Sequence, residues 1–197
     1  MRLILASSSP RRSELLKRAG LKFEVYVPSV DESSVSRDDA GELALLRARL
    51  KAGCAASELS RFGRGDFIVL GADTVVERAG EIFPKPKDEA DALGMLMRLS
   101  AGAHNVYTGV CFVSSNNTAC ERIVRSVVTF GEFEREPLER YVKSGKAFGK
   151  AGAYGIQDEE LGFLIKKTDG ARDNVIGLPV ATVTEMLKEK SKWRQWK

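Results

Sequence analysis

The chain has 197 residues, of which 43% are hydrophobic and 29% are charged, and its formal net charge is +4. This is the composition of an ordinary globular protein, and it excludes a chain that is mainly disordered. No apolar run approaches the roughly 20 residues that a membrane span needs, and the apolar run after Arg2 is too short for a signal peptide. We therefore expect a cytoplasmic protein without a membrane partner.

The positive charge alone does not choose between a nucleic acid and a small polyanionic ligand. The basic residues are spread along the chain rather than gathered in one tract. This distribution argues against an extended contact with a nucleic-acid backbone. We expect no stable nucleic-acid partner.

The cysteines and the histidine limit the available chemistry. The chain has three cysteines, an odd number, and no CxxC pair; they are Cys54, Cys111 and Cys120. We expect them to be buried small hydrophobic residues in a reducing compartment rather than disulfides or zinc ligands. His104 is the single histidine, so a histidine-rich metal site is excluded. A Ser-His-Asp or Cys-His enzyme would have to use this one residue, and no nucleophile motif lies near it.

The first part of the chain alternates strand and helix signals. An apolar run predicts a buried strand, the Ser-Ser-Ser-Pro break after it precedes a helix, and Gly20 is placed to end that helix. The longest helix signal has a stripe that we expect to face the core, made of Leu43, Leu46, Leu50 and Cys54. The predicted elements are a strand over 2–6, a helix over 11–19, a strand over 22–27, a polar loop over 28–39, a helix over 40–59, a central strand over 67–71 and a hairpin over 75–83.

The second part continues with helices and a further hairpin. Asn116 and Asn117 tolerate positive φ and suit a tight turn between two strands. Pro137 stands in the first turn of a short helix, where a proline is tolerated. The predicted elements are a helix over 88–99, strands over 104–115 and 118–130, a helix over 137–143, a strand over 161–167 and a helix over 179–190.

The order of these elements indicates the fold class. Strands that alternate with helices are typical of α/β proteins, and the hairpins make the sheet mixed. No internal repeat or linker divides the chain, and its length favours one domain with two lobes over residues 1–197. Residues 191–197 are predicted to be a loose tail.

The strongest candidate for a ligand site is the segment from Ser7 to Arg12, which reads Ser-Ser-Ser-Pro-Arg-Arg. It lies between a strand and a helix, so unpaired backbone N–H groups and the helix dipole would attract a phosphate. Two arginines add planar donors suited to phosphate oxygens. The alternative is simple capping of the helix by Ser9, which does not need two adjacent arginines.

Two acidic segments are candidates for metal binding or proton transfer. Asp73-Thr74 follows the most hydrophobic strand, and open α/β sheets bind ligands beyond the carboxyl ends of their strands. The alternative is an aspartate that ends the strand in a turn. Asp31-Glu32 lies in a polar loop and by itself suggests only a solvated loop. A second carboxylate matters because Mg²⁺ or Mn²⁺ bound to a triphosphate needs hard oxygen ligands.

Two further segments could contact a nucleotide. Lys85 stands between Pro84 and Pro86, whose stiffness would hold it toward a phosphate, although an exposed turn lysine is the alternative. Gln157 ends the segment Ala-Gly-Ala-Tyr-Gly-Ile-Gln, whose small residues allow a ligand to approach closely, and it offers both a donor and an acceptor to a base edge. Composition alone favours a tight strand pairing with a glutamine at its end.

Taken together, these segments resemble the Maf family of nucleotide pyrophosphatases, the homologues of the septum formation protein. The resemblance runs through nearly the whole chain, and its specificity lies in the order and spacing of the motifs. These are LILASSSPRRSELL, VDE, GADTVV, PKP, YTGV, KAGAYGIQ and NVIGLP. The resemblance implies an α/β fold with a mixed twisted sheet and flanking helices, in two lobes around a central cleft, as in inosine triphosphatase.

The resemblance also implies roles for particular residues. Asp73 matches the family's proton acceptor, and Glu32 and Lys85 match its acidic and basic active-site positions. Glu32 and Asp73 are the expected metal anchors, with Mg²⁺ or Mn²⁺ as the cofactor. The expected substrate-binding residues are Ser7, Arg11 and Arg12 at the triphosphate, and Thr74 and Gln157, with Arg11, at the positions that set specificity.

The implied activity is metal-dependent hydrolysis of a nucleoside triphosphate to its monophosphate and pyrophosphate, in a protein that forms a homodimer. One branch of the family carries a tryptophan before its arginine pair and prefers 7-methyl-GTP, whereas Pro10-Arg11-Arg12 and Ala72-Asp73-Thr74 are similar to the branch that acts on dTTP, UTP and modified pyrimidine nucleotides. Three alternatives stay open: a 7-methyl-GTP pyrophosphatase, an enzyme for inosine-type purine nucleotides, and a nucleotide- or nucleic-acid-binding regulator of cell division with little catalysis.

Overall fold

The computed structural model describes residues 1–63 and 65–196, and of Ser33 only the backbone. Within these residues, eight strands form one mixed sheet in the order β2-β1-β3-β5-β6-β7, with β4 paired to β3 and β8 paired to β6. The pairs β1–β2 and β1–β3 are parallel and the others are antiparallel. The strands are β1 Arg2–Leu5, β2 Glu24–Val25, β3 Phe67–Arg78, β4 Glu81–Phe83, β5 Ala103–Ser114, β6 Thr118–Phe130, β7 Ile165–Asp169 and β8 Arg194–Gln195.

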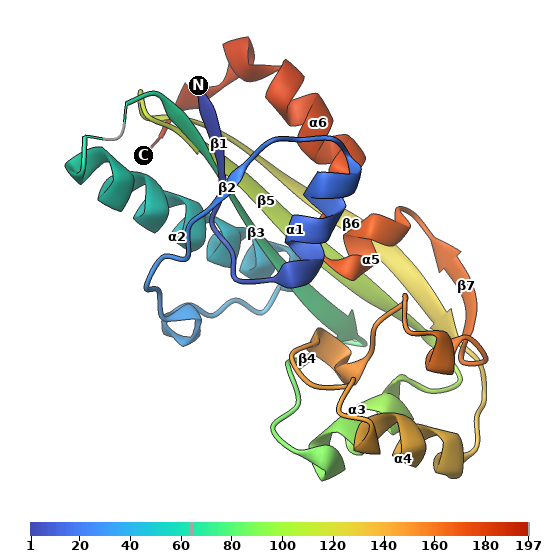
Figure 1. The fold of residues 1–197 in the computed structure, drawn as a ribbon. Coiled ribbons are helices and arrows are strands. Elements are labelled where there is room, and N and C mark those ends of the chain that lie inside the picture. The colour runs from blue at the N-terminus through green and yellow to red at the C-terminus, as the bar shows by residue number, and fades with distance from the viewer. Residues whose placement is uncertain (64, 197) are drawn as a thin grey trace.

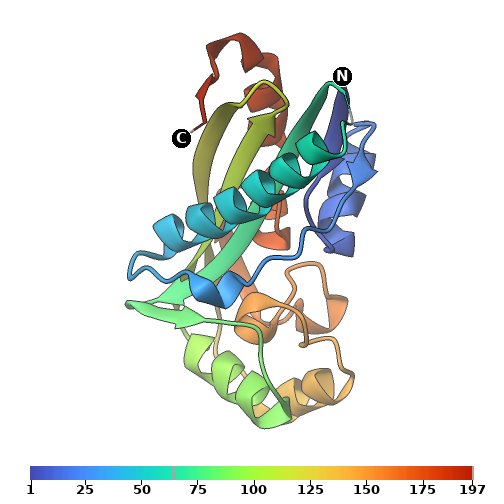
Figure 2. The ribbon, with the colours of Figure 1, turned by 90° about the vertical axis from the view of Figure 1, so that its left-hand side faces the viewer.

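Helices cover both faces of this sheet and one of its ends. α2 crosses one face, while α1, α5 and α6 lie on the other, and α3 and α4 gather at the lower end (Figures 1 and 2). The predicted α/β fold with a mixed sheet and flanking helices is therefore confirmed. The helices are α1 Pro10–Arg18, α2 Ala40–Arg61, α3 Glu89–Leu99, α4 Arg135–Lys143, α5 Arg172–Ile176 and α6 Val180–Lys188, with short 3₁₀ turns η1 Glu32–Ser34, η2 Ala151–Ala153, η3 Glu159–Leu161 and η4 Lys190–Lys192.

The long helix α2 lies very close to the sheet because small residues meet at the contact. A Cβ atom on Gly71 of β3 would lie 2.3 Å from the carbonyl oxygen of Ala48, and one on Gly109 of β5 would lie 2.5 Å from that of Ala44. The predicted stripe is therefore wrong beyond its first member, since Leu46, Leu50 and Cys54 are only half-buried. The fully buried face instead includes Leu43, Ala44, Ala48, Ala52, Ala55 and Leu59.

The opposite face packs larger side chains and also holds the C-terminal segment. Trp193 is 9% exposed and stacks on Phe112 with ring centroids 5.3 Å apart. β8 pairs with the start of β6, and the backbone N–H of Trp196 donates to the carbonyl oxygen of Asn117 at 2.7 Å. The predicted loose tail is thus wrong for residues 191–196, because Trp193 is buried in the core and β8 pairs with β6. Lys197 lies outside the described residues.

The lower end of the molecule has its own core between α3, α4 and the ends of β5 and β6. His104 is buried there, with its Nε2 atom 2.8 Å from the hydroxyl oxygen of Tyr154 and its ring edge-on to Phe130. Burial, assisted by the charge of Arg78, lowers the pKa of His104 to about 4. The single histidine is therefore a neutral core residue at physiological pH.

Several predicted boundaries differ from the structure. β3 continues without interruption from Phe67 to Arg78, so Asp73 lies inside a strand rather than at its end. β2 has two residues, β7 begins at Ile165, and the short α5 was not predicted. The three cysteines are free, and only Cys111 is fully buried. No helix in the described residues is long and apolar enough to span a bilayer.

Candidate active site

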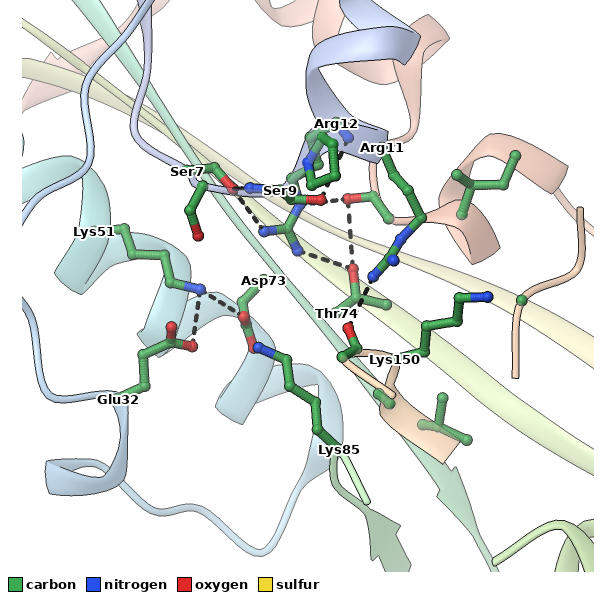
Figure 3. Close-up of a pocket in the computed structure, with 18 of the residues that line it drawn as sticks. Ser7, Ser9, Arg11, Arg12, Glu32, Lys51, Asp73, Thr74, Lys85 and Lys150 are labelled. Atoms are coloured by element: carbon green, nitrogen blue, oxygen red, sulfur yellow. Dashed lines mark hydrogen bonds and ion pairs between the residues drawn. The ribbon is translucent and has the colours of Figure 1, made fainter. Parts of the chain in front are cut away.

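A gap at one edge of β3 opens a cleft. β1 pairs with β3 only as far as Leu5 and Leu70, and β4 joins the same edge from Val76. In the described ladders, residues 71–75 of β3 therefore have a partner only on β5. A cleft of about 490 Å³ lies along this stretch (Figure 3). Because successive residues of a strand point to opposite faces, Asp73 and Thr74 reach this region from opposite faces of the sheet.

The loop after β1 places donors at the start of α1. Ser9 caps the helix by accepting a hydrogen bond from the backbone N–H of Arg12 at 3.4 Å, and Pro10 follows at the first helical position. The Ser7 hydroxyl accepts from the backbone N–H of Ser9 at 3.2 Å. The capping alternative is thus correct, and it coexists with a cleft wall made of Ser7, Ser8 and Ser9. A helix start lined by hydroxyl groups favours an anion.

Arg12 connects three parts of the cleft. Its Nε donates to the carbonyl oxygen of Gly177 at 2.9 Å, its Nη1 to Ser7 Oγ at 3.2 Å and its Nη2 to Thr74 Oγ1 at 3.3 Å. The side chain is buried, and this burial lowers the pKa of the guanidinium below its usual value. An arginine has five N–H donors, so these three contacts leave donors for a ligand. Arg12 can therefore both brace the cleft and contact an anion.

Thr74 belongs to the same network rather than standing alone at the cleft. Its hydroxyl oxygen lies 3.0 Å from that of Thr108, which donates to the carbonyl oxygen of Asn174 at 3.1 Å. The Asn174 side chain is fully buried and donates to Val106 O at 3.1 Å and Ser126 Oγ at 3.0 Å. This chain of hydrogen bonds fixes Thr74 beside Arg12.

On the other face of β3, Lys51 of α2 joins two carboxylates. Its ammonium lies 2.7 Å from Asp73 Oδ1 and 2.9 Å from Glu32 Oε2 (Figure 3). The side chains of Lys51 and Asp73 are 9% and 10% exposed, so their attraction is only weakly screened by water. Arg47 of α2 stands further from Asp73, with 3.9 Å between Nη1 and Oδ2.

Two lysines act on the ionisation of Glu32. Partial burial would raise the pKa of this carboxyl, but its hydrogen bond and charge interaction with Lys51, together with the charge of Lys85, outweigh that effect and hold the pKa below its usual value. Lys85 lines the cleft from the extended segment after β4. Glu32 is therefore a carboxylate at physiological pH.

Glu32 and Asp73 fit a divalent cation that is shared with a ligand. Both carboxylates already direct one oxygen at a common cation, the Lys51 ammonium. Among the described residues no group of three or more acidic, histidine or cysteine side chains forms a complete metal cage. Mg²⁺ usually takes one or two carboxylates together with phosphate oxygens and water. The two side chains suit that partial ligand set.

The far end of the cleft is formed by the glycine-rich segment around η2. Arg11 reaches across from α1, and its Nη2 donates to the carbonyl oxygen of Gly149 at 3.0 Å. Lys150 and the exposed Gln157 also line this end. Burial lowers the pKa of Arg11, which nevertheless stays a cation in the physiological range. The contact links the start of α1 to the glycine-rich segment across the cleft.

Every residue that the sequence analysis predicted as a site residue lies along this one cleft, although these residues come from five separate segments. Of the acidic pair, Glu32 rather than Asp31 lies there. The residues brought together are Ser7, Arg11, Arg12, Glu32, Asp73, Thr74, Lys85 and Gln157.

Sequence reasoning missed three contributors to the cleft, namely Lys51, Lys150 and the backbone carbonyl of Gly177. Lys51 had a visible signal, because it falls on the same helix face as Ala44, Ala48 and Ala55, where a charged residue needs a partner. The Gly177 carbonyl had none, since a backbone contact across 165 positions leaves no mark in a single sequence.

An α/β protein that joins a hydroxyl- and arginine-lined helix start to paired carboxylates belongs to the class of proteins that bind phosphorylated ligands. The family follows from the sequence comparison. The profile described as Maf-like protein matches residues 2–190. The chain therefore belongs to the Maf-like protein family.

Curated relatives carry a more specific name. The dTTP/UTP pyrophosphatase of Symbiobacterium thermophilum is 43% identical over 190 residues, which cover 95% of this chain and 93% of the relative. That of Pelotomaculum thermopropionicum is 38% identical over 188 residues, covering 95% of each chain, and that of Geotalea uraniireducens is 40% identical over 187 residues, covering 94% and 93%. A solved dITP/XTP pyrophosphatase of Mycobacterium abscessus, 12% identical, superposes with a TM-score of 0.44 over 97% of this chain and 95% of that one.

Proposed function

We propose that the chain hydrolyses dTTP and UTP, and related modified pyrimidine nucleotides, to the monophosphate and pyrophosphate. The observation that carries this proposal is the meeting of Arg12, Lys51 and Asp73 in one cleft, with hydroxyl donors at one wall and carboxylates at the other. The relatives named dTTP/UTP pyrophosphatase, 38–43% identical along nearly the whole chain, give it its substrate class.

In this proposal the triphosphate lies along the start of α1. Ser7 and the backbone N–H groups of the loop donate to its oxygens, and Arg11 and Arg12 add positive charge. The base lies at the other end of the cleft, toward Gln157, with Thr74 and Arg11 between the two ends as specificity residues. Lys85 faces the phosphate from the opposite side, where charge develops on the leaving group.

The chemical step is the attack of one water on the α-phosphorus. A bond forms between the water oxygen and the α-phosphorus while the bond from this phosphorus to the bridging oxygen breaks, so that pyrophosphate leaves with that oxygen. Asp73 takes the proton released by the water. Lys51 holds the Asp73 carboxylate at 2.7 Å and thereby fixes its orientation. Arg12 and Lys85 stabilise the negative charge of the departing pyrophosphate.

Mg²⁺ or Mn²⁺ is the proposed cofactor, which Glu32 and Asp73 would hold together with the substrate. When bound, the metal would withdraw charge from the phosphate and so ease the attack. The low pKa of Glu32 keeps this ligand ionised without the metal.

Other expectations rest on the family resemblance and stay proposals. The chain acts as a homodimer in the cytoplasm, as a single two-lobed unit over residues 1–197 without a stable nucleic-acid partner. β3 and β5 contribute residues both to the core beneath α1 and α6 and to the core at the lower end of the molecule. This sharing supports a single unit. Light scattering on the purified protein, which should give twice the chain mass of 21.6 kDa, tests the dimer.

The proposal is tested by measuring pyrophosphate release from a panel of nucleotides with Mg²⁺, with Mn²⁺ and with a chelator. Metal-dependent release from dTTP and UTP, with the monophosphate as the other product, is the expected result. Release chiefly from 7-methyl-GTP or from inosine-type nucleotides would keep the reaction and reject the pyrimidine substrates. Binding of nucleotides without turnover would instead support the regulator of cell division.

A further inference from the structure

Beside Gln157, a group of partly buried side chains holds the carboxylate of Asp158 in place. Asp158 and Lys150 form an ion pair in which each side chain is 11% exposed. The Tyr141 hydroxyl donates to Asp158 Oδ2 at 2.6 Å, and the Lys150 ammonium donates to the same oxygen. The other oxygen, Oδ1, accepts from Gln157 Nε2 at 3.1 Å. The two carboxylate oxygens thus have different partners.

This arrangement determines which way the Gln157 amide faces. An ionised carboxylate accepts hydrogen bonds and cannot donate them, so only the nitrogen of the Gln157 amide can face Asp158. Its carbonyl oxygen, Oε1, is then turned away from Asp158, and no hydrogen bond to it is found among the described residues. Since Gln157 is exposed and lines the cleft, it offers a ligand an acceptor of fixed direction.

We propose that Asp158 is a positioning residue for base specificity, which fixes the Gln157 amide so that Oε1 accepts the N3–H of uracil or thymine. The inference rests on the proposed function and names how that site selects its base. Cytosine carries an acceptor at N3, which would face Oε1 without a hydrogen between the two atoms. An unsatisfied acceptor pair of this kind disfavours the wrong ligand.

The surroundings keep the three side chains together. A Cβ atom on Gly155 would lie 2.4 Å from Gln157 Nε2, 2.7 Å from Asp158 Oδ2 and 2.9 Å from Lys150 Nζ, so the glycine leaves the space that they occupy. Burial, and then the bond to Asp158, raise the pKa of Tyr141. Its hydroxyl therefore stays protonated at physiological pH and donates to Oδ2.

The substitution Asp158→Asn should turn the amide around. Lys150 has only donors, so the oxygen of the new amide stays on the side of Lys150 and Tyr141, and its NH₂ group faces Gln157. Gln157 must then accept with Oε1 and present Nε2 to the base, which suits the N3 acceptor of cytosine. The ratio of kcat/KM for UTP to that for CTP should fall by about tenfold, because UTP then meets an unsatisfied donor pair where it had a hydrogen bond.

A double-mutant cycle separates positioning from a general effect on the fold. We would measure kcat/KM with UTP and with CTP for the wild type, Asp158→Asn, Gln157→Met and the double variant. In the Gln157→Met background, Asp158→Asn should leave the ratio unchanged, because Asp158 acts through Gln157. Glu160→Gln is the matched control, since this exposed carboxylate pairs with Lys146 and should not change the ratio.

The outcomes distinguish this inference from the function on which it rests. A wild type that prefers UTP, with the same ratio in Asp158→Asn, overturns the inference and leaves the proposed function standing. The inference is also overturned if Asp158→Asn changes the UTP/CTP ratio as much in the Gln157→Met background as in the wild type. A wild type that does not discriminate between UTP and CTP overturns it as well. A wild type that hydrolyses neither UTP nor dTTP overturns both. If Asp158→Asn does not fold, Asp158→Gly replaces it, and the ratio should again fall because the amide is released.

Discussion

The two walls of the cleft hold their charges in different ways. On the wall formed by the start of α1, called the α1 wall, Arg12 donates hydrogen bonds to neutral oxygens of Ser7, Thr74 and Gly177. On the opposite wall, formed by Lys51 of α2 with Glu32 and Asp73 and called the α2 wall, the Lys51 ammonium is shared by the two carboxylates. The first arrangement leaves a positive charge available to an anion without any rearrangement. The second ties two carboxylates to one ammonium, so a ligand or metal must compete with Lys51 for their oxygens. We infer that binding and chemistry are divided between the walls.

The substitution expected to have the largest effect is Asp73→Asn, on the α2 wall. It removes the proposed proton acceptor but keeps an oxygen for Lys51, so the fold should remain. We expect kcat for UTP hydrolysis to fall by about 10²–10⁴, the usual contribution of a general base, with little change in KM. Pyrophosphate release measures the rate and thermal unfolding checks the fold. Activity close to that of the wild type would remove Asp73 from the reaction.

Arg12→Lys tests the α1 wall. A lysine retains the charge but cannot bond to three separate acceptors in the plane of a guanidinium. We expect kcat/KM for UTP to fall by about 10–100-fold, mainly through KM, because charged hydrogen bonds of about 1.5–3 kcal/mol are lost. The melting temperature should also fall, since Ser7 and Thr74 lose their buried partner. An unchanged KM would show that charge alone serves this wall.

Lys51→Met tests whether the α2 wall depends on its shared cation. The Lys51 hydrogen bond and charge lower the pKa of Glu32, so their loss should raise that pKa. The carboxyl then stays protonated to higher pH, and the acid limb of the pH profile of kcat/KM should move to higher pH. Profiles of the wild type and the variant provide the comparison. A limb that stays in place would show that Glu32 ionisation does not limit the reaction.

Arg11→Ala should have the smallest effect of the four. Arg11 is less buried than Arg12, and within the described part of the chain it makes one hydrogen bond, to the Gly149 carbonyl at 3.0 Å. We expect KM for UTP to rise only a few-fold and the melting temperature to stay within about 1–2 °C, because partly exposed charges are screened by water. A loss as large as that of Arg12→Lys would erase the proposed difference between the two arginines.

The local features of the fold were predictable, whereas close packing was not. The β5–β6 hairpin and the Ser9 cap follow from short segments whose turn and capping residues act on their neighbours. The buried face of α2 was misjudged because apolar size suggested leucines, while the approach to Gly71 and Gly109 requires alanines. The docked Trp193 depends on Phe112, far away in the sequence, and no local pattern indicates such a contact.

The site shows the same division. Residues in distinctive motifs, such as Arg12 and Asp73, were found from the sequence, and they do line the cleft. Lys51 has no motif around it. Its position on the alanine face of α2 indicates that it needs a partner, but only the packing of α2 against β3 identifies Asp73 and Glu32 as its partners. The gap beside residues 71–75 could not be predicted either, because it depends on where β1 and β4 stop pairing.

The central claim is that water attacks the α-phosphorus of a pyrimidine nucleoside triphosphate in this cleft. Hydrolysis of UTP in water enriched in oxygen-18, with mass analysis of the products, tests it directly. The account predicts one labelled oxygen in the uridine monophosphate and none in the pyrophosphate. Label in the pyrophosphate, or products that are the diphosphate and inorganic phosphate, would contradict it.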